Sequence, residues 1–222
     1  TCYGYFESLN KIFIVVILAA ICAILPLTAI PVIGILMIVL HCFGLNTLVG
    51  AFAACFYLLL YILIMRFVPK DSIVVVLTPF SFMLGIPAVI PIGLGILRKG
   101  ISALAGICAV VSYFFLRSLP DIAELAKSED VNALELLRAM MDTVAKNTEL
   151  LLYAIVFSAV VLVVYILRKV VSSYGWLISI ASGAAVYIVL FSCGAAFLGV
   201  KNDIVSTVTG SLISAGTALV LA

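Results

Sequence analysis

The chain has 222 residues, of which 66% are hydrophobic and only 10% are charged. Its mean hydropathy is +1.41. A water-soluble domain carries roughly 25% charged residues, so this composition excludes an ordinary soluble fold and predicts a surface that faces lipid. With a formal net charge of +2 and no basic run longer than two residues, we expect no nucleic-acid partner.

Seven apolar segments predict an all-α, polytopic membrane bundle, because a helix needs about 20 apolar residues to cross the hydrocarbon core. We expect six to seven of them to be embedded in a lipid bilayer, in a single transmembrane helical domain that covers residues 1–222 and lies in a bacterial cytoplasmic membrane. No basic stretch precedes the first apolar run, so we expect no cleavable signal peptide, and we expect the chain, which begins at Thr1, to be a processed or trimmed piece. The segments are residues 12–43, 48–65, 73–97, 101–116, 150–167, 175–200 and 204–222.

Residues 118–149 form a polar stretch between the fourth and fifth segments, with seven acidic and three basic residues. Ser118 and Pro120 are typical of a helix N-cap and first turn, and Ser128 predicts a second helix start. Apolar residues then recur at helical spacing opposite charged ones, at Leu134, Leu137, Met141 and Val144. We therefore predict an amphipathic, acidic helical excursion, which serves either as a solvated connector or as a surface for a partner.

Two similar stretches, IPVIGIL at 30–36 and IPIGLGIL at 90–97, place proline and glycine inside apolar runs. Proline removes a backbone donor, and the carbonyl that it frees inside a membrane needs a neighbouring helix, a hydroxyl or a cavity. Matched interruptions of this kind point to the substrate site of a transporter, and ordinary kinks that packing satisfies are the alternative. The transporter interpretation predicts broken segments near 26–31 and 79–91 and a ligand-binding region at Pro31, Gly34, Thr78, Ser81, Pro87, Pro91, Gly93 and Gly95.

Basic residues outside the acidic excursion bear on how the segment 73–97 lies in the membrane. If this segment crosses the membrane once, the basic residues divide almost evenly between the two sides. If it returns as a re-entrant hairpin, seven lie on one side and two, Arg117 and Lys201, on the other, as the positive-inside rule prefers. We therefore predict a re-entrant hairpin, with the excursion on the outer side. The seven are Lys11, Arg66, Lys70, Arg98, Lys99, Arg168 and Lys169.

Small residues recur every four positions in three segments, which lets helix backbones approach closely. These small residues serve either the packing of helices within the protein or the docking of another membrane subunit or a second copy. Aromatic residues near segment ends, such as Tyr113, Tyr153, Tyr174 and Trp176, are typical of anchors at the membrane interface. The small residues are Ala19, Ala23, Gly175, Ser179, Gly183, Ser206, Gly210 and Ser214.

The predicted spans contain no Asp, Glu, Lys or Arg, which disfavours a proton relay or an ion-coupled carrier. His41 is the one histidine in the sequence, HExxH does not occur, and the six cysteines include no CxxC pair. Zinc sites and nucleophilic catalysis need such groups close together. We therefore expect no enzyme activity, no metal site and no cofactor.

With few charges, about six spans and the pair Ala19 and Ala23, the chain resembles the substrate-binding S components of energy-coupling-factor importers. The resemblance implies a small ligand held within the membrane domain, although the acidic excursion departs from that pattern. Our leading hypothesis is a non-catalytic transport or permease-type subunit that binds a small or amphipathic ligand near the broken helices. A scaffold that recruits a partner through residues 118–149 and the small-residue faces is the alternative, and a channel lined by Thr78, Ser81, Thr207 and Thr209 is the third.

Overall fold

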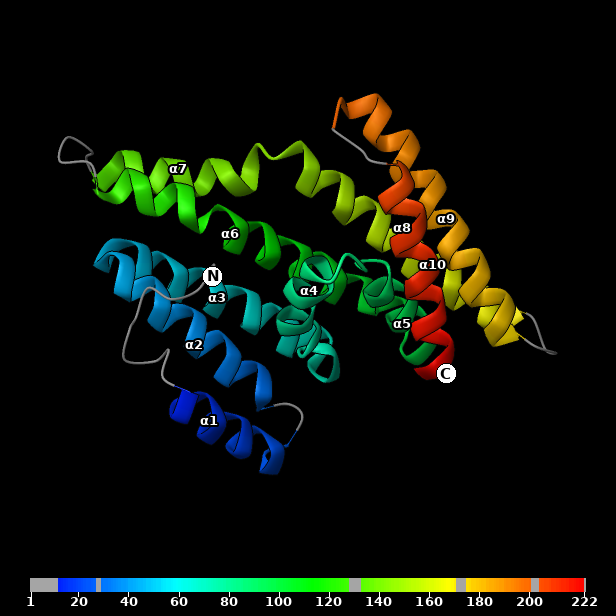
Figure 1. Ribbon diagram of the computed structural model, residues 1–222, viewed down its shortest axis with the longest axis horizontal. Helices are drawn as coiled ribbons and strands as arrows, with labels where there is room; N and C mark the ends of the chain where they lie inside the picture. Colours follow the sequence, from blue (N-terminus) through cyan, green and yellow to red (C-terminus); the bar gives the residue numbers. More distant parts are fainter. Residues whose placement is uncertain (1–11, 27–28, 128–132, 171–174, 201–203, 222) are drawn as a thin grey trace. The chain divides into compact units, whose positions relative to one another are not determined.

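The computed structural model describes residues 12–26, 29–127, 133–170, 175–200 and 204–221, and every regular element in these ranges is a helix (Figure 1). The predicted all-α class is therefore confirmed for the described part of the chain. Two compact units are present. The first comprises Thr1–Val76 and Phe114–Lys146, and the second comprises Leu77–Tyr113 and Asn147–Ala222.

The first apolar segment of the first unit is two helices, α1 (Ile12–Ile24) and α2 (Ile30–Leu45). Pro31 occupies the first turn of α2, where the missing backbone N–H has no intrahelical partner to lose. α3 (Thr47–Phe67) begins directly after Asn46, whose Oδ1 accepts a hydrogen bond from the Leu48 backbone N–H at 2.9 Å. Asn46 thus ends one helix and caps the next, which makes α2 and α3 a packed helical hairpin.

The core of the first unit lies between α3, the C-terminal part of α6 (Ala103–Lys127) and α7 (Ala133–Ala145). The rings of Phe56 and Phe115 stack with their centroids 4.8 Å apart, and Tyr57 meets Phe115 edge-on at 5.9 Å. Met140 of α7 is fully buried. The short 3₁₀ helix η2 (Pro69–Asp71) follows α3 and holds Asp71, a carboxylate that is only 4% exposed.

The second unit is built on the antiparallel helix pair α8 (Thr148–Val170) and α9 (Gly175–Leu198). α5 (Val89–Leu97) packs on both of these helices, and α10 (Ile204–Leu221) packs on α5 and α9. Val164 of α8 lies where three helices meet: a Cβ built on Gly95 of α5 would come within 2.6 Å of it, and one built on Gly183 of α9 within 2.5 Å. These two glycines let α5 and α9 approach α8 closely, as small residues do between membrane helices. The remaining elements are α4 (Val74–Met83) and the 3₁₀ helix η3 (Gly100–Ser102).

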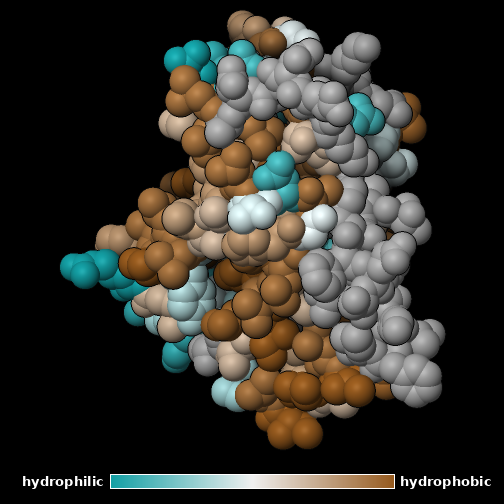
Figure 2. All heavy atoms as spheres, turned by 90° about the vertical axis from the view of Figure 1, so that its left-hand side faces the viewer, coloured by the Kyte–Doolittle hydropathy of each residue, from teal (hydrophilic) through white to brown (hydrophobic). Residues whose placement is uncertain are grey.

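Four described segments are long and apolar enough to cross a membrane, namely Thr47–Phe67, Gly100–Ala126, Leu134–Val170 and Gly175–Leu198. Ile30–Leu45 and Val205–Val220 are apolar but shorter. Large apolar side chains such as Leu58, Leu59 and Ile62 are more than half exposed on α3, and apolar residues cover much of the face drawn in Figure 2. A membrane-embedded protein accounts for this surface, while the count of six to seven spans stays a prediction.

The expectation that a new helix begins at Ser118 is wrong, because α6 runs without interruption through Ser118 and Pro120 to Lys127. The Ser118 hydroxyl donates to the Phe115 carbonyl at 2.8 Å and so bonds back into the preceding turn instead of capping a new helix. Burial of Leu119, Ile122 and Ala123 explains the continuation, since an unbroken helix packs all three into the first unit. The second start predicted at Ser128 lies outside the described residues.

Candidate functional site

The chain breaks between α4 and α5, where Leu84–Ala88 are not helical. Gly85 has a φ of 71°, a left-handed conformation that favours glycine, and Pro87 follows two residues later. The Ile86 backbone N–H donates to the Ser81 carbonyl at 2.9 Å, which closes α4 with a wide turn. Pro79 lies inside α4 and Pro91 lies in the first turn of α5, so the break falls at Gly85 and Pro87.

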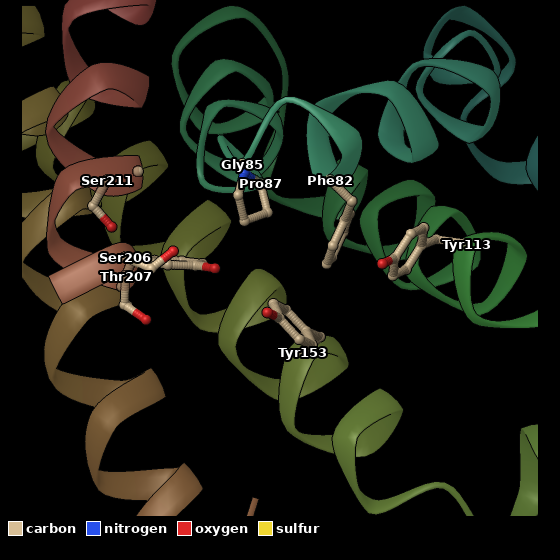
Figure 3. A pocket seen from close by; sticks show the side chains of 10 residues that line it. Phe82, Gly85, Pro87, Tyr113, Tyr153, Ser206, Thr207 and Ser211 are labelled. Carbon is tan, nitrogen blue, oxygen red and sulfur yellow. The ribbon is translucent and has the colours of Figure 1, made fainter. Parts of the chain in front are cut away.

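A cavity of about 230 Å³ lies against this break, entirely within the second unit (Figure 3). It is lined from one side by the break and from the others by α6, α8, α9 and α10. Six of the lining residues carry a hydroxyl group. The lining residues are Phe82, Gly85, Pro87, Tyr113, Tyr153, Tyr187, Ser206, Thr207, Gly210 and Ser211.

Aromatic rings form one wall of the cavity and pack on one another. Phe82 stacks on Tyr113 with ring centroids 3.9 Å apart and meets Tyr153 edge-on at 4.9 Å. Tyr153 also lies 4.7 Å from the ring of Phe191. Mutual stacking fixes these rings, so the phenol groups present their hydroxyls at defined positions.

α10 forms the opposite wall with Ser206, Thr207 and Ser211, whose hydroxyls are seen together in Figure 3. α10 reaches the break because its Gly210 has no side chain: a Cβ there would collide with the Gly85 carbonyl oxygen. Ser211 is 1% exposed, and its Oγ has no hydrogen-bond partner among the described residues. A buried hydroxyl without a partner is unfavourable by roughly 1–3 kcal/mol, which makes Ser211 a candidate contact for a ligand.

The lining contains no acidic, basic or histidine residue among the described side chains. The cavity can therefore hold a guest by hydrogen bonds to hydroxyls and by contact with aromatic and proline carbon, but it offers no counter-ion. An unpaired charged guest would be costly in such a place.

The predicted ligand-binding residues fall in four places. Pro87 lines the cavity, and Thr78 and Ser81 are buried in α4, where the Ser81 hydroxyl donates to the Thr78 carbonyl at 2.7 Å. Pro91, Gly93 and Gly95 lie along α5, with Gly95 against Val164. Pro31 and Gly34 belong to α2 of the first unit, where Gly34 faces Val76.

Two of the residues assigned to helix packing, Ser206 and Gly210, line the cavity. Others lie in helix contacts: Gly183 is against Val164, and the Ser179 and Ser214 hydroxyls bond back to the carbonyls of Gly175 and Gly210 at 2.6 and 2.7 Å. Ala19 and Ala23 are exposed on α1.

Sequence reasoning missed the aromatic wall. Tyr113 and Tyr153, interpreted as interfacial anchors, line the cavity, and Tyr187 was not singled out. A usable signal was the i, i+4 aromatic pair that occurs on two successive segments, Tyr153 with Phe157 and Tyr187 with Phe191. Buried Asp71, between α3 and α4, was also missed.

No family model, curated protein or solved structure matches the chain.

Proposed function

We propose that the protein is a non-catalytic, membrane-embedded transport or permease-type subunit that binds a small solute in the cavity at the α4–α5 break. The observation that carries this proposal is the coincidence of three features in one place: a Pro/Gly break, a solute-sized hollow and a cluster of hydroxyls. Broken helices whose backbone lines a cavity are the usual way in which transporters build a site inside the bilayer.

The segment 73–97 acts in this proposal as a re-entrant hairpin. α4 and α5 have 10 and 9 residues, about 15 and 14 Å of helix, so neither crosses a ~30 Å core alone. Two contacts with α8 indicate how deep the break would lie in the membrane. The break lies beside Tyr153 near the start of α8, and a Cβ on Gly100 would lie 3.2 Å from the ring of Tyr165 near its end. The chain from the break through α5 to Gly100 thus runs along the part of α8 between Tyr153 and Tyr165.

This placement favours a return of the chain. The break already lies level with the beginning of the α8 span, so a ten-residue apolar α4 continuing in the same direction would leave the membrane. Turning back keeps α4 in lipid and places Lys70 and Lys99 on one side, in agreement with the distribution of basic residues. Lys11 and Lys201, which also enter that distribution, lie outside the described residues.

Water access to the cavity tests the proposal. In a variant whose six cysteines are replaced by alanine, Thr207→Cys places a thiol in the cavity wall, and Thr209→Cys places one on the exposed face of the same helix, only about 3 Å away along its axis. A membrane-impermeant thiol reagent added to proteoliposomes should modify Thr207→Cys and leave the lipid-facing Thr209→Cys unmodified. Equal reaction at both positions, or reaction at neither, would refute a water-accessible site inside the bilayer.

A scaffold role is the second candidate, and it rests on α7. Leu134 and Met141, two turns apart on one face of that helix, are 59% and 60% exposed, while Glu135, Arg138 and Asp142 are exposed beside them. An amphipathic helix with a bare apolar stripe can dock a partner. Such a role requires no aqueous access at Thr207, so the labelling experiment also separates the two candidates.

A further inference from the structure

We infer that the solute bound at the α4–α5 break is small, neutral and polyhydroxylated, and that the Ser211 hydroxyl pairs directly with one of its hydroxyl groups. This inference rests on the proposed function and names the ligand class for the same cavity. Four features of the cavity support it: its volume, the charge of its lining, the stacking of its rings and the Ser211 hydroxyl.

The volume of the cavity limits the guest to a few carbon atoms. Water occupies about 30 Å³ per molecule in the liquid, so the cavity volume of about 230 Å³ corresponds to about eight waters. A guest of roughly eight to ten non-hydrogen atoms fits this space. That is the size of a four- or five-carbon linear polyol, and it is below the volume typical of sites for drug-sized ligands.

The charge of the lining selects against ions. Carboxylates and phosphates bound in proteins are held by arginine, lysine or clustered backbone N–H groups, and none of the described lining side chains is basic. The described lining residues also include no acidic partner for a cation. A neutral guest avoids the desolvation penalty that any charged guest would meet here.

Ring geometry distinguishes a neutral guest from a quaternary ammonium ion, the remaining class that aromatic sites recognise. Such ions bind over open ring faces. Here the face of Phe82 is covered by Tyr113 at 3.9 Å, and Tyr187 stacks on Phe191 at 5.8 Å. The rings are engaged with one another, so what the three tyrosines offer the cavity is their hydroxyl groups.

Ser211 supplies the specific contact. Its Oγ is buried and has no partner among the described residues, and Figure 3 shows the hydroxyl directed from α10 toward the cavity side that holds Ser206 and Thr207. A hydroxyl both donates and accepts, which matches a guest whose own hydroxyls do the same. Phe82 and Pro87 cover the opposite side with carbon, which suits the C–H face of a polyol.

Protection of the cavity thiol tests the inference. Thr207→Cys in the cysteine-free background is labelled with and without erythritol, xylitol, choline or acetate, in proteoliposomes of one lipid composition. We expect erythritol and xylitol to slow the labelling in a saturable manner, and choline and acetate to leave the rate unchanged. Adding Ser211→Ala should raise the half-protecting polyol concentration about fivefold to tenfold, the effect of one lost hydrogen bond.

Ser214→Ala is the matched control, because Ser214 is buried one turn further along α10 and its hydroxyl is already bonded to the Gly210 carbonyl. This variant should leave the half-protecting concentration unchanged. Labelling that no polyol slows, protection by choline instead, or equal polyol protection with and without Ser211→Ala would each overturn the inference while the proposed function stands. Absence of labelling at Thr207→Cys removes the proposed function and the inference together.

Discussion

Replacing Gly210 with alanine is expected to destabilise the second unit, whereas the same replacement at Gly216, also on α10, is not. A Cβ on Gly210 collides with the carbonyl oxygen of Gly85, a backbone atom that moves only if the break itself moves. A Cβ on Gly216 meets nothing within 4 Å. The two variants therefore share the change in helix propensity and differ in one contact.

The size of the difference follows from that contact. Alanine is favoured over glycine in a helix by about 0.5–1 kcal/mol, and this gain cancels when the two variants are compared. Forcing an extra carbon into a packed site costs about 1–3 kcal/mol. We therefore expect Gly210→Ala to be less stable than Gly216→Ala by about 1–3 kcal/mol, or roughly 2–12 °C in unfolding temperature for a chain of this size.

Thermal unfolding in one detergent, followed by circular dichroism, measures this difference directly. Gly216→Ala should unfold at or slightly above the temperature of the unmodified protein. If Gly210→Ala unfolds together with Gly216→Ala, α10 does not approach the α4–α5 break as closely as described, and the cavity wall that depends on this approach is refuted.

Three further outcomes are expected. Gly85→Ala should lower the free energy of unfolding by about 1–2 kcal/mol, because the φ of 71° strains any residue with a Cβ. Gly93→Ala in α5, where the new carbon meets open space, should not lower it. Equal unfolding temperatures of the two variants would contradict the assigned turn. Ser211→Ala should raise the free energy of unfolding of the ligand-free protein by roughly 1 kcal/mol, because it removes a buried hydroxyl that has no partner among the described residues. A loss of stability would show that this hydroxyl has a hydrogen-bond partner. Lys146→Met should change the unfolding temperature by less than a degree or two. The 2.7 Å ion pair of Lys146 with Asp142 is largely exposed, and such a pair contributes about 0.3–0.5 kcal/mol. A larger shift would mean that the pair is shielded from solvent.

Local sequence signals predicted the features that local chemistry decides. Composition alone indicated the membrane class, and Pro87 marked the place where α4 gives way to α5, because a missing donor acts within one turn of the chain. The left-handed Gly85 beside it was not singled out. Pro31 at the start of α2 is explained in the same way.

Features that depend on distant partners were not predictable in this way. Pro120 did not end α6, because burial of Leu119 and Ile122 outweighs the lost hydrogen bond. Tyr113 and Tyr153 lie near segment ends, where an interfacial anchor and a cavity wall look alike in sequence; only the meeting of α6, α8 and α10 decides between them. Ser211 carried no signal, since nothing local shows that its hydroxyl lacks a partner.

The membrane sidedness of Lys70 and Lys99 tests the central claim, that a re-entrant hairpin brings the Gly85 break to a solute site. Single cysteines replace Lys70, Lys99 or Glu135, all exposed, in the cysteine-free background, and intact cells are treated with an impermeant thiol reagent. The proposed topology places Glu135→Cys on α7 on the outer side. The account predicts that Glu135→Cys reacts and that Lys70→Cys and Lys99→Cys both stay unmodified until the membrane is permeabilised. Reaction at only one of the two lysine positions in intact cells would show that the segment crosses the membrane, which contradicts the hairpin and the site built on it.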